Sequence, residues 1–341
     1  MGTKIFEIIQ GKEINLDDLR DKRLAIDTFN MLYQFLSSIR QRDGQLLTDS
    51  KGRVTSHLIG LFTRTINFLQ KGIKPIFVFD GKKPELKEKE SKRRHKIKQE
   101  AFENLKKAET EEEKRKYASM TSKLTTQMIE ESKELVEALG CPVIQAPSEG
   151  EAQCAAIVKN ENAYAVVSQD ADAFLFGGAR VIRNLSITKK RKLPGKQTYL
   201  TINPEIIELE NVFNDLGVDQ DQLIVMAMLV GTDYNLKGIK NIGQKKALKL
   251  VKQYKTDFDE LFIDLRWKDY FDYSWQEVFY LIKNMPVTNN YKLEWKKPDQ
   301  DQIKKILIDK HDFSEERVIK TISKLLKIEN KKQQKPLGKW L

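Results

Sequence analysis

The chain has 341 residues, which allows one large domain or two smaller ones, and carries a formal net charge of +11 at pH 7. The two cysteines, Cys141 and Cys154, exclude a disulfide framework and a cysteine zinc site, and no apolar run is long enough for a membrane span or a signal core. We therefore expect an intracellular protein, cytoplasmic or nucleoid-associated (nuclear in a eukaryote), whose excess of Lys and Arg favours a nucleic-acid partner.

Short apolar runs in the first two thirds of the chain alternate with segments of helical spacing. Strands are predicted at 22–27, 74–81, 140–145 and 163–170, with helices at 28–40, 56–70 and 152–159. Residues 180–187 and 196–200 are expected to form edge strands or a hairpin. This alternation predicts an α/β fold with a central, mostly parallel, twisted sheet and helices on both faces.

A strongly charged segment follows the second predicted strand. Residues 82–98 carry nine basic and three acidic side chains, and residues 99–140 continue as charged helix with a break near 118–119. Such a run is often only a solvated helical face. Its position directly after Asp80 favours a functional role.

The last third of the chain is predicted to be mainly helical. A helix at 222–230 leads into Gly231-Thr-Asp233-Tyr, and a Gly238-to-Gly243 turn precedes a helix rich in lysine. Residues 237–255 hold seven lysines and no acid. A turn of this kind presents backbone N–H groups to a DNA phosphate, although a plain helix–helix connection would have the same pattern. We favour the DNA contact because of the lysines.

Several acids follow predicted strands or turns and are expected to meet at one rim of the sheet, because parallel strands end at the same edge. They are Asp27, Asp80, Glu149, Glu151, Asp170, Asp172 and Asp233. Each alone could be a turn former or a helix-start charge. Together, oxygen ligands without His or Cys suit Mg²⁺ or Mn²⁺, and seven acids fit two ions that act on a phosphodiester.

The order of these motifs along nearly the whole chain resembles the flap endonucleases, structure-specific 5′-nucleases of the XPG-type superfamily, in their archaeal form. The resemblance is carried by Ala25-Ile-Asp27, Tyr33-Gln-Phe-Leu36, Thr55-Ser-His-Leu58, Gly72-Ile-Lys-Pro75, Val78-Phe-Asp80-Gly81, Ala146-Pro-Ser-Glu-Gly-Glu-Ala152, Ser168-Gln-Asp170-Ala-Asp172, Gly231-Thr-Asp-Tyr-Asn235 and His311-Asp-Phe-Ser-Glu-Glu-Arg317. It implies a monomeric nuclease with endonuclease and 5′-3′ exonuclease activity. The expected substrate is branched DNA with a 5′ flap, in replication and repair.

The resemblance also implies roles for individual residues. The seven acids would hold two Mg²⁺ ions, with Mn²⁺ as a substitute. Lys87 and Arg94 would project from a helical arch at 82–130 toward the scissile phosphate and act with Glu149, Glu151, Asp170 and Asp172 in catalysis. DNA contacts are expected from Tyr33, Arg40, Arg64, Glu149, Gly231, Asp233, Gly238, Gly243, Lys245 and Lys246, with K⁺ at the 238–243 turn.

The C-terminal residues are expected to form a docking peptide for a sliding clamp. Gln334, Leu337, Trp340 and Leu341 carry this pattern, although such residues could also pack on their own domain. Trp340-Leu341 stands where the family pattern has two aromatics, and Asn241 stands where glycine is frequent. Asn tolerates the left-handed conformation, so the turn should survive.

The expected organisation has five parts. They are a nuclease region at 1–98, the rest of the arch at 99–130, an internal nuclease region at 131–260, a helical part at 261–328 and the tail at 329–341. Two other functions remain open: a related nuclease that prefers gaps, bubbles or four-way junctions, and a non-catalytic junction or clamp scaffold.

Overall fold

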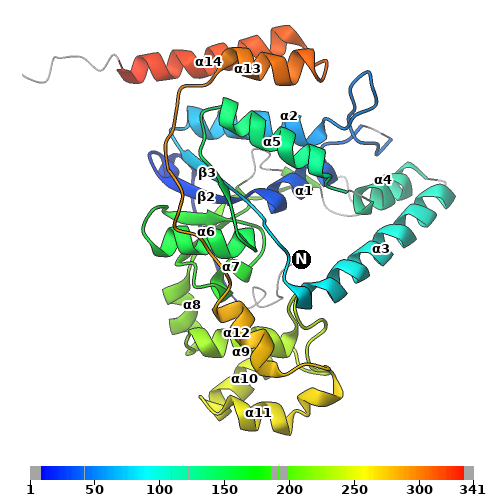
Figure 1. Ribbon diagram of the computed structural model, residues 1–341, viewed down its shortest axis with the longest axis vertical. Coiled ribbons are helices and arrows are strands. Elements are labelled where there is room, and N and C mark those ends of the chain that lie inside the picture. Colours follow the sequence, from blue (N-terminus) through cyan, green and yellow to red (C-terminus); the bar gives the residue numbers. More distant parts are fainter. Residues whose placement is uncertain are drawn as a thin grey trace, which may run out of the picture.

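The computed structural model describes residues 9–41, 43–108, 110–121, 123–185, 190–192 and 199–333. Within these ranges the protein combines a central sheet, helices on both of its faces and a helical limb that leaves the body (Figure 1). None of the helices in these ranges combines the length and the apolar character that a membrane crossing requires.

The central sheet has seven strands in the order β1-β9-β6-β5-β2-β3-β4. Their bounds are β1 Lys12–Glu13, β2 Arg23–Asp27, β3 Lys74–Phe79, β4 Val143–Gln145, β5 Ala165–Val167, β6 Arg180–Arg183 and β9 Glu205–Glu208. Strands β4, β3, β2, β5 and β6 run parallel, whereas β9 is antiparallel to both β6 and β1. The predicted mostly parallel α/β sheet is confirmed.

One part of the strand prediction is wrong. Residues 180–183 form the inner strand β6, which pairs with β5 on one side and β9 on the other, and so are not at an edge. The buried Val181 and Ile182 show why, since both faces of this strand are covered. A separate hairpin joins β7 (Lys190–Lys192) to β8 (Tyr199–Thr201).

Alternating side chains of the middle strands enter two cores, one on each face of the sheet. Leu24 and Ile26 face the core beneath α1 and α2, whereas Ala25 enters the core beneath α6 and α9. The first layer contains α1 (Thr28–Ser38), α2 (Ser56–Gln70) and α5 (Thr126–Ala138). The second contains α6 (Gly150–Lys159), α7 (Asp172–Leu175), α8 (Leu209–Leu216) and α9 (Gln220–Val230).

The charged segment after β3 forms this limb, which is the predicted helical arch. It consists of α3 (Glu88–Lys107), entered through a 3-10 turn at Glu85–Lys87, and α4 (Glu111–Met120), which returns toward α1. Figure 1 shows this arch projecting to one side of the sheet. The charged side chains that predicted it are mostly exposed, as expected for a helix that no core covers.

The C-terminal helices divide between the two cores. Near the second layer lie α10 (Gln244–Tyr254), α11 (Phe258–Asp264) and α12 (Trp275–Lys283), whereas α13 (Gln300–Lys304) and α14 (Glu315–Gln333) belong with the first layer. Shorter helical turns cover Leu16–Leu19, Trp267–Asp269 and Lys305–Asp309. Helix α14 continues unbroken to Gln333, past residue 329 where the tail is expected to begin.

A buried charged cluster connects the segment just before α14, which contains His311 and Asp312, to α2 and α5. His57 and His311 both point an Nε2 atom at the carboxylate of Glu131, at 3.5 and 3.3 Å, and His311 Nδ1 lies 3.0 Å from Asp49. Ser50 adds a hydrogen bond to Asp312. Through Glu131, the cluster joins the histidine motifs at 55–58 and 311–317.

This cluster predicts a pH dependence of stability. Burial lowers the pKa of His57 below its ordinary value, and Glu131 only partly offsets this effect. Below about pH 6.5 this site therefore binds more protons in the unfolded chain than in the folded one, so His57 lowers the stability as pH drops. Asp27 and Asp80, whose pKa values are raised to about 8 and about 6, act in the opposite direction over this range, so the effect of His57 is measured as a difference from a His57→Gln variant. Thermal melting from about pH 8 to about pH 5.5 tests this.

The matched comparison uses two histidines. The melting temperature of wild type relative to His57→Gln should fall as the pH is lowered from about 8 to about 5.5, whereas that of wild type relative to His95→Gln, at an exposed position on α3, should not change with pH. A difference in melting temperature between wild type and His57→Gln that stays constant, or moves in favour of wild type, as the pH is lowered would contradict the assignment.

Candidate active site

The acids at the ends of the parallel strands lie along one rim of the sheet. Asp27 is the last residue of β2 and caps α1 by accepting a hydrogen bond from Asn30 N at 3.1 Å. Asp80 directly follows β3. Asp170 lies three residues beyond β5, in the turn before α7. The rim forms because the parallel strands end together.

The acidic pair stands at the start of α6, with a glycine between its members. Glu149 is the N-cap and Glu151 lies in the first turn. Gly150 N donates to Asp80 Oδ1 at 2.7 Å, and a Cβ at this position would lie 2.5 Å from the same oxygen. Only glycine therefore lets Asp80 approach the helix start, where the helix dipole favours negative charge.

The last two acids come from the second layer. Asp172 is the first residue of α7, and Asp233 lies in the turn that follows α9. Asn235 holds this turn by accepting from the Thr232 hydroxyl at 2.6 Å and donating to Met228 O at 2.7 Å. The Tyr273 hydroxyl donates to Tyr234 O at 2.9 Å.

Electrostatic coupling joins six of the seven carboxylates, and Lys87 links the seventh, Asp233, to Glu149. Burial and the neighbouring Asp80 raise the pKa of Asp27 to about 8, and burial with Glu149 raises the pKa of Asp80 to about 6. Burial together with Asp172, Asp27 and Asp170 raises the pKa of Glu151 well above its usual range. Acids held this closely are neutralised by bound protons or by nearby cations.

Two cations of the arch are paired with these acids. Lys87 Nζ lies 2.6 Å from Glu149 and 3.3 Å from Asp233, and Arg94 Nη2 donates to both oxygens of Asp233 at 2.8 Å. Burial opposes the charge on Lys87, but these carboxylates raise its pKa. With the side chains in these positions, no three acid, His or Cys groups in the described ranges are arranged to hold a metal ion.

Two residues of the rim escaped the sequence analysis. Asn30 Nδ2 donates to Asp170 Oδ2 at 2.9 Å, and the Ser168 hydroxyl donates to Glu151 Oε1 at 2.8 Å. Asp170 N in turn donates to Ser168 Oγ at 3.1 Å. Polar residues three positions after Asp27 and two before Asp170 are the only sequence signal of these contacts.

The predicted DNA contacts near α1 and α2 lie in different environments. Tyr33 is 40% exposed, and Lys98 of the arch lies over its ring with Nζ 5.2 Å from the centroid. Arg40 is half-buried and donates to Gly44 O at 2.7 Å. Arg64 is buried, donates to Leu185 O and lies over Phe35, so its guanidinium already has partners in the core.

The turn at 238–243 keeps the predicted conformation. Gly238 and Asn241 have φ of 56° and 65°, so Asn241 adopts the left-handed geometry expected of it. A Cβ on Gly231 or Gly238 would meet backbone atoms at 2.6 or 2.3 Å, so both glycines permit this close crossing. Gly243 caps α10, and Lys245 and Lys246 are exposed on its first turn.

The predicted clamp peptide, Gln334 to Leu341, lies outside the described residues.

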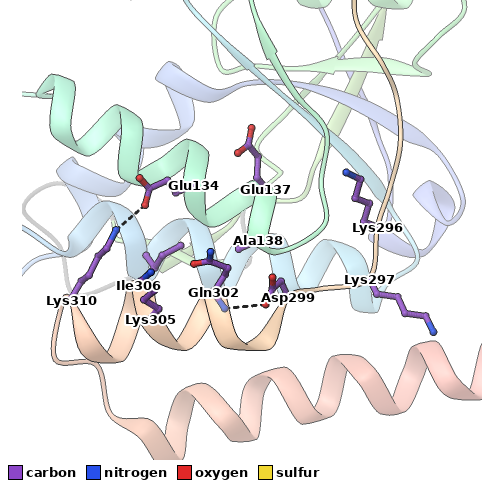
Figure 2. Close-up of a pocket in the computed structure, with 10 residues that line it drawn as sticks. All are labelled: Glu134, Glu137, Ala138, Lys296, Lys297, Asp299, Gln302, Lys305, Ile306 and Lys310. Atoms are coloured by element: carbon purple, nitrogen blue, oxygen red, sulfur yellow. Dashed lines mark hydrogen bonds and ion pairs between the residues drawn. The ribbon is translucent and has the colours of Figure 1, made fainter.

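A separate pocket of about 570 Å³ lies between α5 and the α13 segment, away from the acid rim (Figure 2). Its lining mixes acids with lysines, and Figure 2 shows Lys310 paired with Glu134 across it at 3.0 Å. Beside this pocket, Ile303, Ile306 and Leu307 share one apolar core with Leu135 and Val136 of α5.

The domain comparisons agree with this geometry. The sequence matches the XPG N-terminal domain over residues 3–101 and the XPG I-region over residues 140–233. These two regions carry all seven rim acids. The fold and the site therefore define a nuclease of the XPG type, an enzyme that hydrolyses phosphodiester bonds.

Whole-chain comparisons narrow the class. Flap endonuclease 1 of Pyrococcus furiosus is 50% identical over all of this chain and 99% of its own length, and that of Staphylothermus marinus is 49% identical over 96% and 95%. The solved structure of flap endonuclease-1 from Methanococcus jannaschii superposes with a TM-score of 0.76 at 40% identity, covering 97% of this chain and 100% of that one. The catalytic core of Rad2 with a DNA substrate superposes with a TM-score of 0.70 at 25% identity, over 95% of this chain and 100% of that one. The chain belongs to the flap endonuclease family.

Proposed function

We propose that this flap endonuclease hydrolyses the phosphodiester at the base of a 5′ flap with two divalent cations, Mg²⁺ or Mn²⁺. The observation that supports the proposal is the meeting of seven carboxylates at one rim, with two arch cations paired to them. The donor set also fits, since carboxylate oxygens without His or Cys suit these hard cations. Burial and neighbouring acids raise the pKa values of Glu151 and Asp27, and bound divalent cations would keep these carboxylates ionised.

The roles of the carboxylates follow from their positions. Asp27 and Asp80 at the ends of β2 and β3, together with Glu149 at the start of α6, would hold one ion. Asp170, Asp172 and Asp233 would hold the other, with Glu151 near both. Bound ions of this kind supply an activated water and stabilise the leaving oxygen.

The arch cations would then change partner. Lys87 and Arg94 contact Glu149 and Asp233, so metal binding to these acids would release both side chains. They would be free to neutralise the charge that develops on the scissile phosphate. Their present contacts keep them within reach of the place where that phosphate would lie.

The remaining DNA contacts grip the substrate without reading its sequence. Tyr33 would stack on a base once Lys98 moves aside, and Arg40 would contact the backbone near the bend. The 238–243 turn, with Lys245 and Lys246 beside it, would bind the duplex backbone, assisted by a monovalent cation such as K⁺. The sequence of Gln334, Leu337, Trp340 and Leu341 supports docking on a sliding clamp.

Substrate choice tests the proposal most directly. With Mg²⁺ present, the single-turnover rate should be highest on a 5′-flap substrate and at least about 10-fold lower on a bubble or a four-way junction. The contacts that bind the flap junction would also position its scissile phosphate at the acid rim, and a junction of another shape would be positioned less well. The measurement uses matched oligonucleotides with one labelled 5′ end. Cleavage should map to the base of the flap and disappear with a chelator.

Two outcomes would contradict it. Equal or faster cleavage of bubbles or four-way junctions would favour another branch of the superfamily. Tight junction binding without incision in Mg²⁺ or Mn²⁺ would favour a scaffold.

A further inference from the structure

The arch carries one carboxylate that is nearly inaccessible to solvent. Glu90, in the first turn of α3, is 2% exposed. It lies on a helix whose surface is otherwise largely charged and open to solvent. None of the roles assigned to the acid rim uses it, and an acid here works against the binding of a polyanion to the arch.

Both oxygens of Glu90 are taken by neighbouring arginines. Arg93 donates from Nε to Oε2 at 2.6 Å and from Nη2 to Oε1 at 2.8 Å, and Arg94 donates from Nε to Oε1 at 2.6 Å. These contacts outweigh the burial of the carboxylate and lower the pKa of Glu90 below its usual range. Charge-assisted hydrogen bonds of this length are the strong ones.

The contact with Arg94 has a directional consequence. Glu90 holds the Nε side of the guanidinium, whereas the Nη2 nitrogen extends to Asp233 on the acid rim. An arginine side chain has many rotamers, and fixing its Nε side selects those that aim the outer edge at the rim. The neighbouring pair Glu88–Lys92 has the same spacing as Glu90–Arg94, but its side chains are 65% and 75% exposed. Such exposed pairs contribute little.

We propose that Glu90 is a positioning residue for the cleavage reaction: it fixes the guanidinium of Arg94 so that its Nη2 edge faces the scissile phosphate. This inference rests on the proposed role of Arg94 at that phosphate. It adds a residue that touches neither the DNA nor the rim acids and acts only through Arg94.

The first test separates rate from binding. Glu90→Gln should lower the single-turnover rate at saturating enzyme by about 10- to 100-fold, the usual effect of losing a group that orients a catalytic one. The affinity for flap DNA, measured by anisotropy with a chelator, should stay equal or become tighter, because a negative charge is removed. Glu88→Gln changes the same charge on the same helix and should leave the rate within about twofold.

The second test is a double-mutant cycle. In an Arg94→Ala background, Glu90→Gln should cause no further loss of rate, whereas in an Arg93→Ala background it should still be costly. A general weakening of α3 would instead add to the effect of Arg94→Ala, and would overturn the proposal. Glu90→Asp, which keeps the carboxylate, should recover part of the rate.

The failures of the two proposals are distinguishable. If Arg94→Ala cleaves flaps at the wild-type rate, the proposed role of Arg94 is wrong, and the role of Glu90 with it. If Arg94→Ala is slow while Glu90→Gln is as fast as wild type, only the role of Glu90 is wrong.

Discussion

Replacing Asp170 and Asp172 together by asparagine is expected to lower the single-turnover rate of flap cleavage by about 10³-fold or more, because the rim loses two of its half-buried acids. Asparagine keeps the shape of each side chain, and Asn30 and the Ser168 hydroxyl already hold the Asp170 turn. The variant should therefore fold normally. Its affinity for flap DNA in a chelator should be equal or tighter, since two negative charges are removed.

The control removes the same charge elsewhere. Asp215→Asn with Asp301→Asn changes two exposed aspartates, one on α8 and one on α13, and should cleave at the wild-type rate. Cleavage by the Asp170/Asp172 variant at a rate near wild type in Mg²⁺ would show that these acids do not serve the reaction. Loss of DNA binding in that variant would show that they serve the junction contact instead.

Much of the rim could be predicted because it depends on local patterns and one topological rule. The short apolar runs that end at Asp27 and Asp80 predict buried strands, and parallel strands end at the same edge of a sheet. The position of Asp170 was less direct, because β5 stops at Val167 and a turn carries the acid to the rim. Glu149 was predictable as a helix-start acid, since α6 begins immediately after it.

Individual side-chain partners in segments far apart in the chain could not be predicted. Asn30 and Asp170 are separated by 140 residues, and Arg94 and Asp233 by 139. Arg64 shows the same limit from the other side, because its sequence neighbours give no sign that its partners are Leu185 O and the ring of Phe35. Side-chain partners of this kind are fixed only when the layers have packed.

The burial of Glu90 has a similar origin. A charged helix of alternating acids and bases predicts a solvated face, and Glu88 follows that rule. Glu90 departs from it because Arg93 and Arg94 fold back over its carboxylate. Both Glu88–Lys92 and Glu90–Arg94 have the i,i+4 spacing that predicts an exposed ion pair on a helix. The two pairs differ in the structure because Arg94 also donates to Asp233 on the acid rim.

The two glutamates of α6 should differ in their effect on the reaction. Glu151→Gln is expected to lower the single-turnover rate by about 10³-fold, and Glu149→Gln by only about 10- to 100-fold. Burial and three neighbouring acids raise the pKa of Glu151, which indicates that this side chain lies at the centre of the rim. Glu149 lies toward the arch, where Lys87 pairs with it at 2.6 Å, and a glutamine there can still accept that hydrogen bond.

Rates measured across a Mg²⁺ titration distinguish the two positions, because both substitutions remove one charge and change no volume. A central ligand of both ions should raise the Mg²⁺ concentration needed for half-maximal rate and also lower the maximum, whereas a peripheral one should mainly raise that concentration. Mn²⁺, which binds such oxygen sites more tightly, should recover more of the activity of Glu149→Gln than of Glu151→Gln. If Glu149→Gln proves the more damaging, the pairing with Lys87 is the more important feature of this helix start, and the two ions are divided differently among the acids.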